Sequence, residues 1–267
     1  MPNGFLAELK LFHGSVDKIK SKTELSNFEI KIVVLFQGVN LTFIVRDPSL
    51  YSADGEKLEH PVIAALKSLS LEESQENDIE NLITVKTECD IDLTHRCFVG
   101  KNNAYSVLLK TLKKTKDGDK THLIKALETF CSLCNGQPDL LNEEGAEEFM
   151  SIMKNEKNDA DVTELIVKLV RLNCIKHEMN RRMFVKNDLI KELVRVLMTY
   201  KSSPSMIKEV AFGLRVLTQD DDLRVPFGSA HENAKQIVIE GDALRELISI
   251  CKGKVVHYSL LYKTLNK

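Results

Sequence analysis

The 267-residue chain contains no tryptophan and is poor in turn-forming residues, with 12 glycines and 6 prolines. Sheet proteins with many strands need many turns, so this scarcity favours helices over a sandwich or barrel. A hydrophobic content of 43% still supports a folded core. The longest aliphatic and aromatic run covers residues 32–36 and is far too short to span a bilayer. We therefore expect a helical globular protein that is not inserted in a membrane.

The chain also lacks an excess of charge of one sign, because its formal net charge is −2. Such a balance gives no electrostatic footprint for nucleic acid or an anionic membrane, and we expect neither as a partner. Charge is nevertheless patchy, since acids dominate residues 71–99 and lysines dominate residues 100–130. Patches of this kind are typical of solvated outer faces of neighbouring helices. The alternative is a lysine rim that meets an acidic partner, formed by Lys110, Lys113, Lys114, Lys116 and Lys120.

Six cysteines occur in the chain, but its first residues lack a basic stretch followed by an apolar core. We therefore expect no secretory leader, a cytoplasmic and/or nuclear location, and reduced thiols that pack as small hydrophobic side chains. Cys131 and Cys134 form one CxxC pair, whereas a structural zinc site usually needs two such pairs. We predict that this pair packs in the core. A metal-binding protein built around Cys131, Cys134 and His177 is the alternative.

Motifs for catalysis are missing as well. The sequence has no nucleophile elbow, phosphate loop or paired metal motif, and its histidines have no acid or nucleophile at a recognisable spacing. The basic stretch at residues 179–183 is brief, and we interpret it as a helix end where arginines complement the helix dipole. We expect no enzymatic activity, no catalytic residues, no metal and no cofactor.

The first 57 residues differ from the rest of the chain. Residues 28–36 alternate and then become wholly apolar, a strand-like pattern for which we find no partner strand. An isolated strand is marginal, so we expect an irregular N-terminal segment and linker over residues 1–57. Pro61 suits a first helical turn, and we expect capping helices over residues 58–99.

Two ladders of apolar residues run through residues 100–251. Leu108, Met150, Leu193 and Leu247 form the first ladder. Its first two intervals fall within the roughly 40–47 residues of a HEAT or armadillo repeat, and the last interval is longer. The second ladder repeats at helical spacing on one helix face: Ala126, Phe130, Leu133; Leu165, Leu169, Leu172; Val210, Leu214, Leu217. We therefore predict an all-α fold, a right-handed α-solenoid over residues 100–251, with a disordered tail at residues 252–267.

The long final interval contains additional residues between positions 218 and 238. Asp220, Asp221, Asp222 and Arg224 lie there, and insertions in solenoids map to loops on one face, often the binding face. One interpretation is a helix-ending loop whose acids cap the next segment and pair with Arg215 or Arg224. The other is a charged contact on the rim of a binding groove.

Both ladders together resemble armadillo repeats, in which a helix begun by Gly or Asn is followed by a longer helix lining a concave groove. Three stretches more narrowly resemble the armadillo repeat-containing protein 6 family: residues 37–45, 98–105 and 214–234, the last of which holds the Asp triplet. The resemblance covers about residues 37–251 and implies a non-enzymatic scaffold for protein interactions. Residues 1–36 and the end of the ladder at Cys251 depart from the family pattern, which suggests a truncated or aberrantly terminated member.

A groove of this kind would be lined by the helices at residues 121–134, 162–173 and 206–218. We predict that a protein partner of unknown identity binds there to a monomeric chain. The candidate contacts are Ser132, Lys168, Arg171, Asn173, Arg215, Asp220, Asp221, Asp222 and Arg224.

A nuclear-transport carrier for basic signals is the disfavoured alternative. The groove helices of such armadillo carriers resemble a pattern with Asn just before the last ladder leucine and Trp one turn earlier. The side chains at the Asn places are those of Ser132, Arg171 and Val216, and tryptophan is absent. Groove asparagines would hold a peptide backbone and tryptophans would cradle lysine stems, so this sequence lacks both devices.

Overall fold

The computed structural model describes residues 59–71, 77–115, 120–156, 158–240, 245 and 247–249, together with the backbone of three strands between residues 22 and 46. The chain divides into two compact units, residues 1–60 and residues 61–267, and each is described by itself. The expected tail at residues 252–267 lies outside the described residues.

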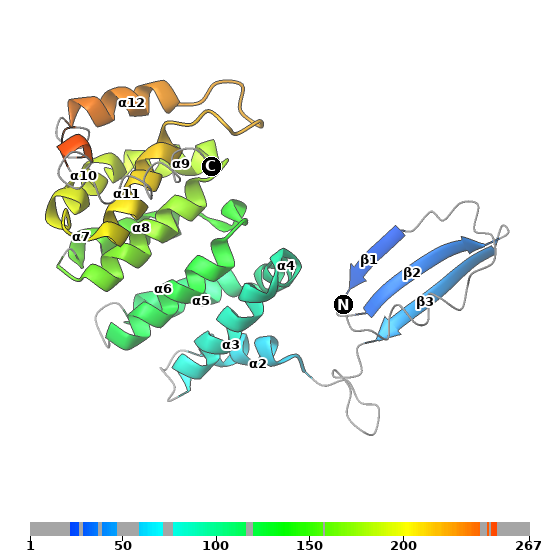
Figure 1. The fold of residues 1–267 in the computed structure, drawn as a ribbon. Helices are drawn as coiled ribbons and strands as arrows, with labels where there is room; N and C mark the ends of the chain where they lie inside the picture. Colours follow the sequence, from blue (N-terminus) through cyan, green and yellow to red (C-terminus); the bar gives the residue numbers. More distant parts are fainter. Residues whose placement is uncertain are drawn as a thin grey trace. The chain divides into compact units, whose positions relative to one another are not determined.

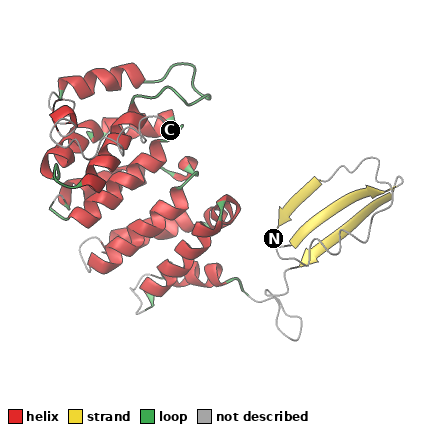
Figure 2. Ribbon diagram, viewed as in Figure 1, coloured by secondary structure: helices red, strands yellow, loops and turns green. Residues whose placement is uncertain are grey.

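The first unit contains an antiparallel sheet in the order β1-β2-β3, formed by β1 (Lys22–Ser26), β2 (Glu29–Phe36) and β3 (Val39–Arg46) (Figure 2). The expectation that the apolar strand lacks a partner is wrong, because β2 pairs with both neighbours. Residues 22–46 thus contain a regular sheet instead of the irregular segment that we expected. The missed signal is the alternation of β3 only two residues after β2, a spacing typical of a hairpin.

The second unit is helical, as the ladders predict. Its elements are α2 (Pro61–Leu69), α3 (Asp78–Ile91), α4 (Leu93–Lys101), α5 (Ala104–Thr115), α6 (Lys120–Cys134), the 3₁₀ helix η2 (Pro138–Leu140), α7 (Glu143–Asn155), α8 (Ala160–Cys174), α9 (Glu178–Lys186), α10 (Leu189–Thr199), α11 (Pro204–Leu217) and α12 (Ala230–Ile239). Three successive repeats have a short, a medium and a long member: α4-α5-α6, η2-α7-α8 and α9-α10-α11. In the described part of the chain, no helix is both long and apolar enough to cross a membrane.

The long helices stack in sequence order. Neighbours pack α3 against α6, α6 against α8, and α8 against α11 (Figure 1). The row is backed by α2, α5, α7 and α10, each of which packs against one long helix. This arrangement confirms the all-α solenoid and places the three predicted groove helices, here α6, α8 and α11, side by side in one row with α3.

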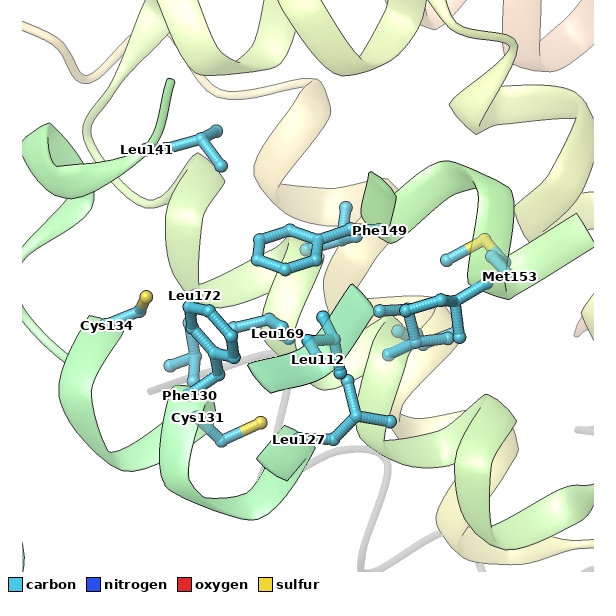
Figure 3. Close-up of a cluster of buried hydrophobic side chains, with 14 of the residues drawn as sticks. Leu112, Leu127, Phe130, Cys131, Cys134, Leu141, Phe149, Met153, Leu169 and Leu172 are labelled. Atoms are coloured by element: carbon cyan, nitrogen blue, oxygen red, sulfur yellow. The ribbon is translucent and has the colours of Figure 1, made fainter. Parts of the chain in front are cut away.

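The ladders form the core of this stack. Leu108, Met150 and Leu193 are buried. Phe130 lies edge-on to Phe149, with a centroid distance of 5.3 Å (Figure 3), and edge-on to Tyr105, with a centroid distance of 5.6 Å. Two outer positions of the ladders, Leu165 and Leu247, are only partly buried. Within α3, Leu82 and Val85 are buried, whereas Ile83 is 44% exposed and does not belong to the core.

The CxxC pair lies inside this core. Cys131 is 5% exposed and Cys134 is fully buried, which confirms the expectation of core packing (Figure 3). Burial raises the pKa of Cys131 to about 12 and also raises that of Cys134, so both side chains stay thiols at neutral pH. Among the described residues, no group of three or more His, Cys, Asp or Glu side chains is arranged to hold a metal ion.

The chain leaves α6 and α8 through the same left-handed turn. Gly136 and Lys176 each lie two residues beyond the end of their helix, with φ of 80° and 51°. Glycine adopts this conformation without steric cost, whereas a side chain with a Cβ pays roughly 1–2 kcal/mol. The repeated backbone geometry therefore strains the lysine.

Substitution of this lysine tests the turn. We expect Lys176→Gly to raise the free energy of unfolding by about 1 kcal/mol, because it relieves the left-handed strain. The matched change Lys191→Gly, inside α10, should lower it by about 1 kcal/mol. Chemical denaturation of both variants measures the two shifts, and a destabilised Lys176→Gly protein would contradict the assignment of the turn.

Candidate functional site

The candidate site is the side of the long-helix row that the backing helices leave uncovered. A cavity of about 330 Å³ opens there at the junction of α3, α6 and α8. Its polar lining comes from Lys86, Asp90, Glu128, Ser132, Asn135 and Lys168, and its apolar lining from Cys131, Leu165 and Leu172. The structure thus brings two predicted contacts, Ser132 and Lys168, into one cavity.

Acids in this cavity are already neutralised by neighbours. The Nζ of Lys86 lies 2.5 Å from the carboxylate of Asp90, and the Nζ of Lys125 lies 2.9 Å from that of Glu128. Burial alone would raise the pKa of Asp90, but hydrogen bonds from Lys86 and Ser132 lower it below its usual value. The Asp90 hydrogen bond in turn raises the pKa of Lys86. Asp90 is therefore charged and paired at neutral pH, and Glu128 is paired with Lys125.

Lys168 differs from the other charged groups of the cavity. Its side chain is exposed on α8 and, within the described part of the chain, makes no hydrogen bond or ion pair. This ammonium group is therefore available to a ligand.

Arg171 ties the next two helices of the row together. Its Nε lies 2.8 Å from a carboxylate oxygen of Glu209 on α11, and both side chains are mostly buried. Its guanidinium also lies 5.5 Å from the centre of the Phe212 ring, which Lys208 approaches at 6.0 Å. Arg171 thus stabilises the α8–α11 junction, and Lys208 and Phe212 form the groove surface beside it.

Two other predicted contacts have different outcomes. Asn173 is fully buried and donates a hydrogen bond to the carbonyl of Leu169 at 2.9 Å, so its prediction as a groove contact is wrong. The polar side chain satisfies a local backbone group instead of facing solvent. Arg215 is half-buried on α11, in the row as predicted.

The Asp-rich insert is a loop, residues 218–229, that we call the acidic loop. Asp222 is 7% exposed and accepts a hydrogen bond from the backbone N–H of Glu178, the first residue of α9, at 2.8 Å. Arg224 donates to the same carboxylate at 2.9 Å. These two hydrogen bonds, that from Arg224 first, hold the pKa of Asp222 well below its usual range. The acid thus caps an earlier helix, not the following segment as our first interpretation supposed.

A buried arginine fixes the start of the acidic loop. Arg181, fully buried on α9, pairs with Asp221 and donates to the carbonyls of Cys174 at 2.9 Å and Gln219 at 2.5 Å. Buried Glu178 accepts from the backbone N–H of Ser229 at 2.7 Å. The prediction that residues 179–183 form a helix end is therefore wrong, because these residues lie inside α9, where Arg181 and Arg182 bind the loop.

The loop also reaches two earlier turns. Arg224 donates to Asp139 at 2.7 Å and to the carbonyl of Lys176 at 3.2 Å. His177 caps α9 by accepting the N–H of Asn180 on Nδ1 at 3.2 Å, so its Nε2, 2.9 Å from Asp139, is the donor. The acidic loop therefore connects the turns that follow α6, α8 and α11. Three predicted rim contacts, Asp221, Asp222 and Arg224, serve the fold.

The remaining predicted charged contacts are Asp220 and the lysines of the possible rim, and most of these lysines have partners within the fold. Asp220 is exposed on the acidic loop. From the possible lysine rim, Lys113 pairs with Glu144 at 2.6 Å and Lys120 pairs with Asp159 at 2.7 Å. Lys114 donates to the carbonyl of Leu71, and Lys116 lies outside the described residues. These partners favour the solvated-face interpretation of the lysines.

The chain is similar in sequence to several known proteins. No protein-family model matches the chain. Armadillo repeat-containing protein 6 of human is 33% identical over 81% of the chain, and that of Pongo abelii is equally similar. The Drosophila melanogaster homologue is 33% identical over 80% of the chain. The chain belongs to the armadillo repeat-containing protein 6 family. It spans 44% of the human member and 46% of the fly member of this family.

Solved structures agree on the fold of this family member. A designed armadillo repeat protein in complex with the peptide (KR)4 matches with a TM-score of 0.59 at 15% identity, covering 76% of this chain and 78% of that chain. A computationally designed armadillo repeat protein for modular peptide recognition matches with a TM-score of 0.57 at 14% identity, covering 71% and 74%. At these identities the likeness supports the armadillo fold alone.

Removal of the buried guanidinium tests the anchoring of the acidic loop. We expect Arg181→Met to lower the free energy of unfolding by about 3 kcal/mol, because it leaves buried carboxylates without their cation. Lys186→Met, on the same helix but 81% exposed, should cost no more than about 1 kcal/mol. Urea denaturation measures both, and equal losses would contradict the special role of Arg181.

Acid titration tests the helix cap made by Asp222. Because its pKa is lower in the folded chain than the roughly 3.9 of an unfolded aspartate, its charge adds stability above that value, which is lost as pH falls towards the folded pKa. We expect wild type to be more stable than Asp222→Asn at neutral pH, with a difference that shrinks below about pH 4.

Asp220→Asn is the matched control for this titration, since the side chain of Asp220 is exposed. Denaturation midpoints at several pH values should separate the two variants. A difference between wild type and Asp222→Asn that is independent of pH would rule out the charged cap.

Proposed function

We propose that this chain is a non-enzymatic scaffold that binds an extended segment of a protein partner along the uncovered side of α3, α6, α8 and α11. The observation that carries the proposal is the exposed polar and aromatic surface of this row, which includes the cavity at Lys168 and the Lys208–Phe212 surface. Membership in an armadillo family supports a role in protein binding.

Chemistry of the site favours binding over catalysis. The CxxC thiols are buried with raised pKa values, and His177, which lies beside Asp139, serves as a helix cap. Most charged groups around the row form ion pairs within the fold. The surface thus offers recognition groups without an activated nucleophile.

A carrier for basic signals remains the second candidate, because the designed armadillo protein that matches in fold holds the peptide (KR)4. The residues with which such carriers hold a peptide differ from those of this chain. Ser132 and Arg171 replace groove asparagines, Arg171 is engaged by Glu209, and Val216 is 7% exposed. We therefore favour the general scaffold function over the carrier function. The proposal also includes a monomeric chain in the cytoplasm or nucleus.

Photo-crosslinking from the groove tests the proposal. We expect full-length chain with benzoylphenylalanine at Lys208, on α11, to form discrete crosslinks to partner protein in extracts of cells that express it. The same group at Lys191, exposed on the backing helix α10, should form none of these products. Mass spectrometry identifies the linked peptides. The same products from both positions, or products from Lys191 alone, would contradict the groove assignment.

A further inference from the structure

The cavity at α3, α6 and α8 combines an apolar wall with polar groups, some of which are already paired within the fold. Cys131 and Leu172 are buried, and the Cys131 thiol lies 3.6 Å from the carbonyl of Leu165. Its charged groups are Lys86, Asp90, Glu128 and Lys168. The chemistry of a ligand follows from which of these groups are already engaged.

Both acids are engaged, as are their partners. Lys86 holds Asp90 at 2.5 Å and Lys125 holds Glu128 at 2.9 Å, while Ser132 adds a hydrogen bond to Asp90. A cationic ligand would have to compete with these lysines. The acids therefore do not form a ready site for a basic side chain.

Two donors face the cavity without partners of their own. The ammonium of Lys168 and the carboxamide of Asn135 are exposed, and neither side chain makes a hydrogen bond or ion pair to the described residues. The two lysines and two acids of the lining balance in charge, but Glu128 is already paired with Lys125, which lies outside the lining. Lys168 is therefore the lysine of the lining that no described acid neutralises. An ammonium and an amide N–H together suit a ligand that brings acceptor oxygens.

We propose that this cavity binds the carboxylate side chain of a glutamate or aspartate within an extended acidic segment of the partner. Lys168 holds the carboxylate, and Asn135 hydrogen-bonds the main chain of the segment beside it. The inference rests on the proposed groove function, to which it adds the charge of the bound segment. It is the opposite of the charge carried by (KR)4.

One free ammonium matches a carboxylate better than a phosphate group. A carboxylate brings a single negative charge, whereas a phosphorylated side chain carries about −1.5 to −2 at neutral pH. The surplus charge would meet Asp90 and Glu128, which line the same cavity. Like charges in this position disfavour the phosphate.

Fluorescence anisotropy of the full chain with labelled peptides tests the inference. The probes are three octapeptides with blocked ends, in which serine alternates with glutamate, glutamine or lysine. We expect the glutamate peptide to bind most tightly, and Lys168→Glu to weaken it roughly tenfold. Since Lys168 makes no hydrogen bond or ion pair to the described residues, this variant should unfold at the wild-type temperature.

Lys191→Glu is the matched control, because it makes the same change in net charge on α10 and should alter the affinity less than twofold. Equal weakening by Lys168→Glu and Lys191→Glu, equal or tighter binding of the glutamine or lysine peptide, or no binding of any peptide would each overturn the inference. The crosslinks from Lys208 report on the proposed function separately, since they require no acidic ligand.

Discussion

The structure depends on one constraint: a pair of amphipathic helices cannot bury its apolar surface alone, so each repeat needs a neighbour. Phe130 satisfies this constraint at the centre of the stack, where it is fully buried against rings from α5 and α7. The long helices consequently lie in one row, with backing helices on one side. The backing helices leave the opposite side of the row uncovered, and we propose that a partner binds there.

Ion pairs divide the charged residues between folding and recognition. The acidic loop helps to fix three turns of the stack, through its own Asp222 and Arg224 and through its contact with the buried Arg181 of α9. Groove acids likewise pair with lysines or with Arg171. Because these groups neutralise one another, the charge that distinguishes the cavity is the ammonium of Lys168, which has no ion-pair partner among the described residues. The binding chemistry that we propose follows from this unpaired group.

Much of the solenoid could be predicted from sequence, because helical periodicity records which face of each helix is buried. The ladder through Phe130 and Leu214 located the long helices correctly. Partners distant in sequence were not predictable from that pattern: the Asp triplet seemed a local cap or a rim, whereas its acids bind Glu178 and Arg181 some 40 residues earlier. Opposite charges in the two stretches were the available signal. The prediction of Asn173 as a groove contact failed for another reason, since a helix can bury a polar side chain that hydrogen-bonds its own backbone.

The most direct test of the groove is a ¹H–¹⁵N titration of the full chain with the tightest-binding of the three octapeptides. The account predicts that shifts concentrate on the C-terminal end of α6, including the Asn135 side-chain amide, and on the exposed face of α8. Shifts concentrated on the backing helices α5, α7 and α10 would contradict it.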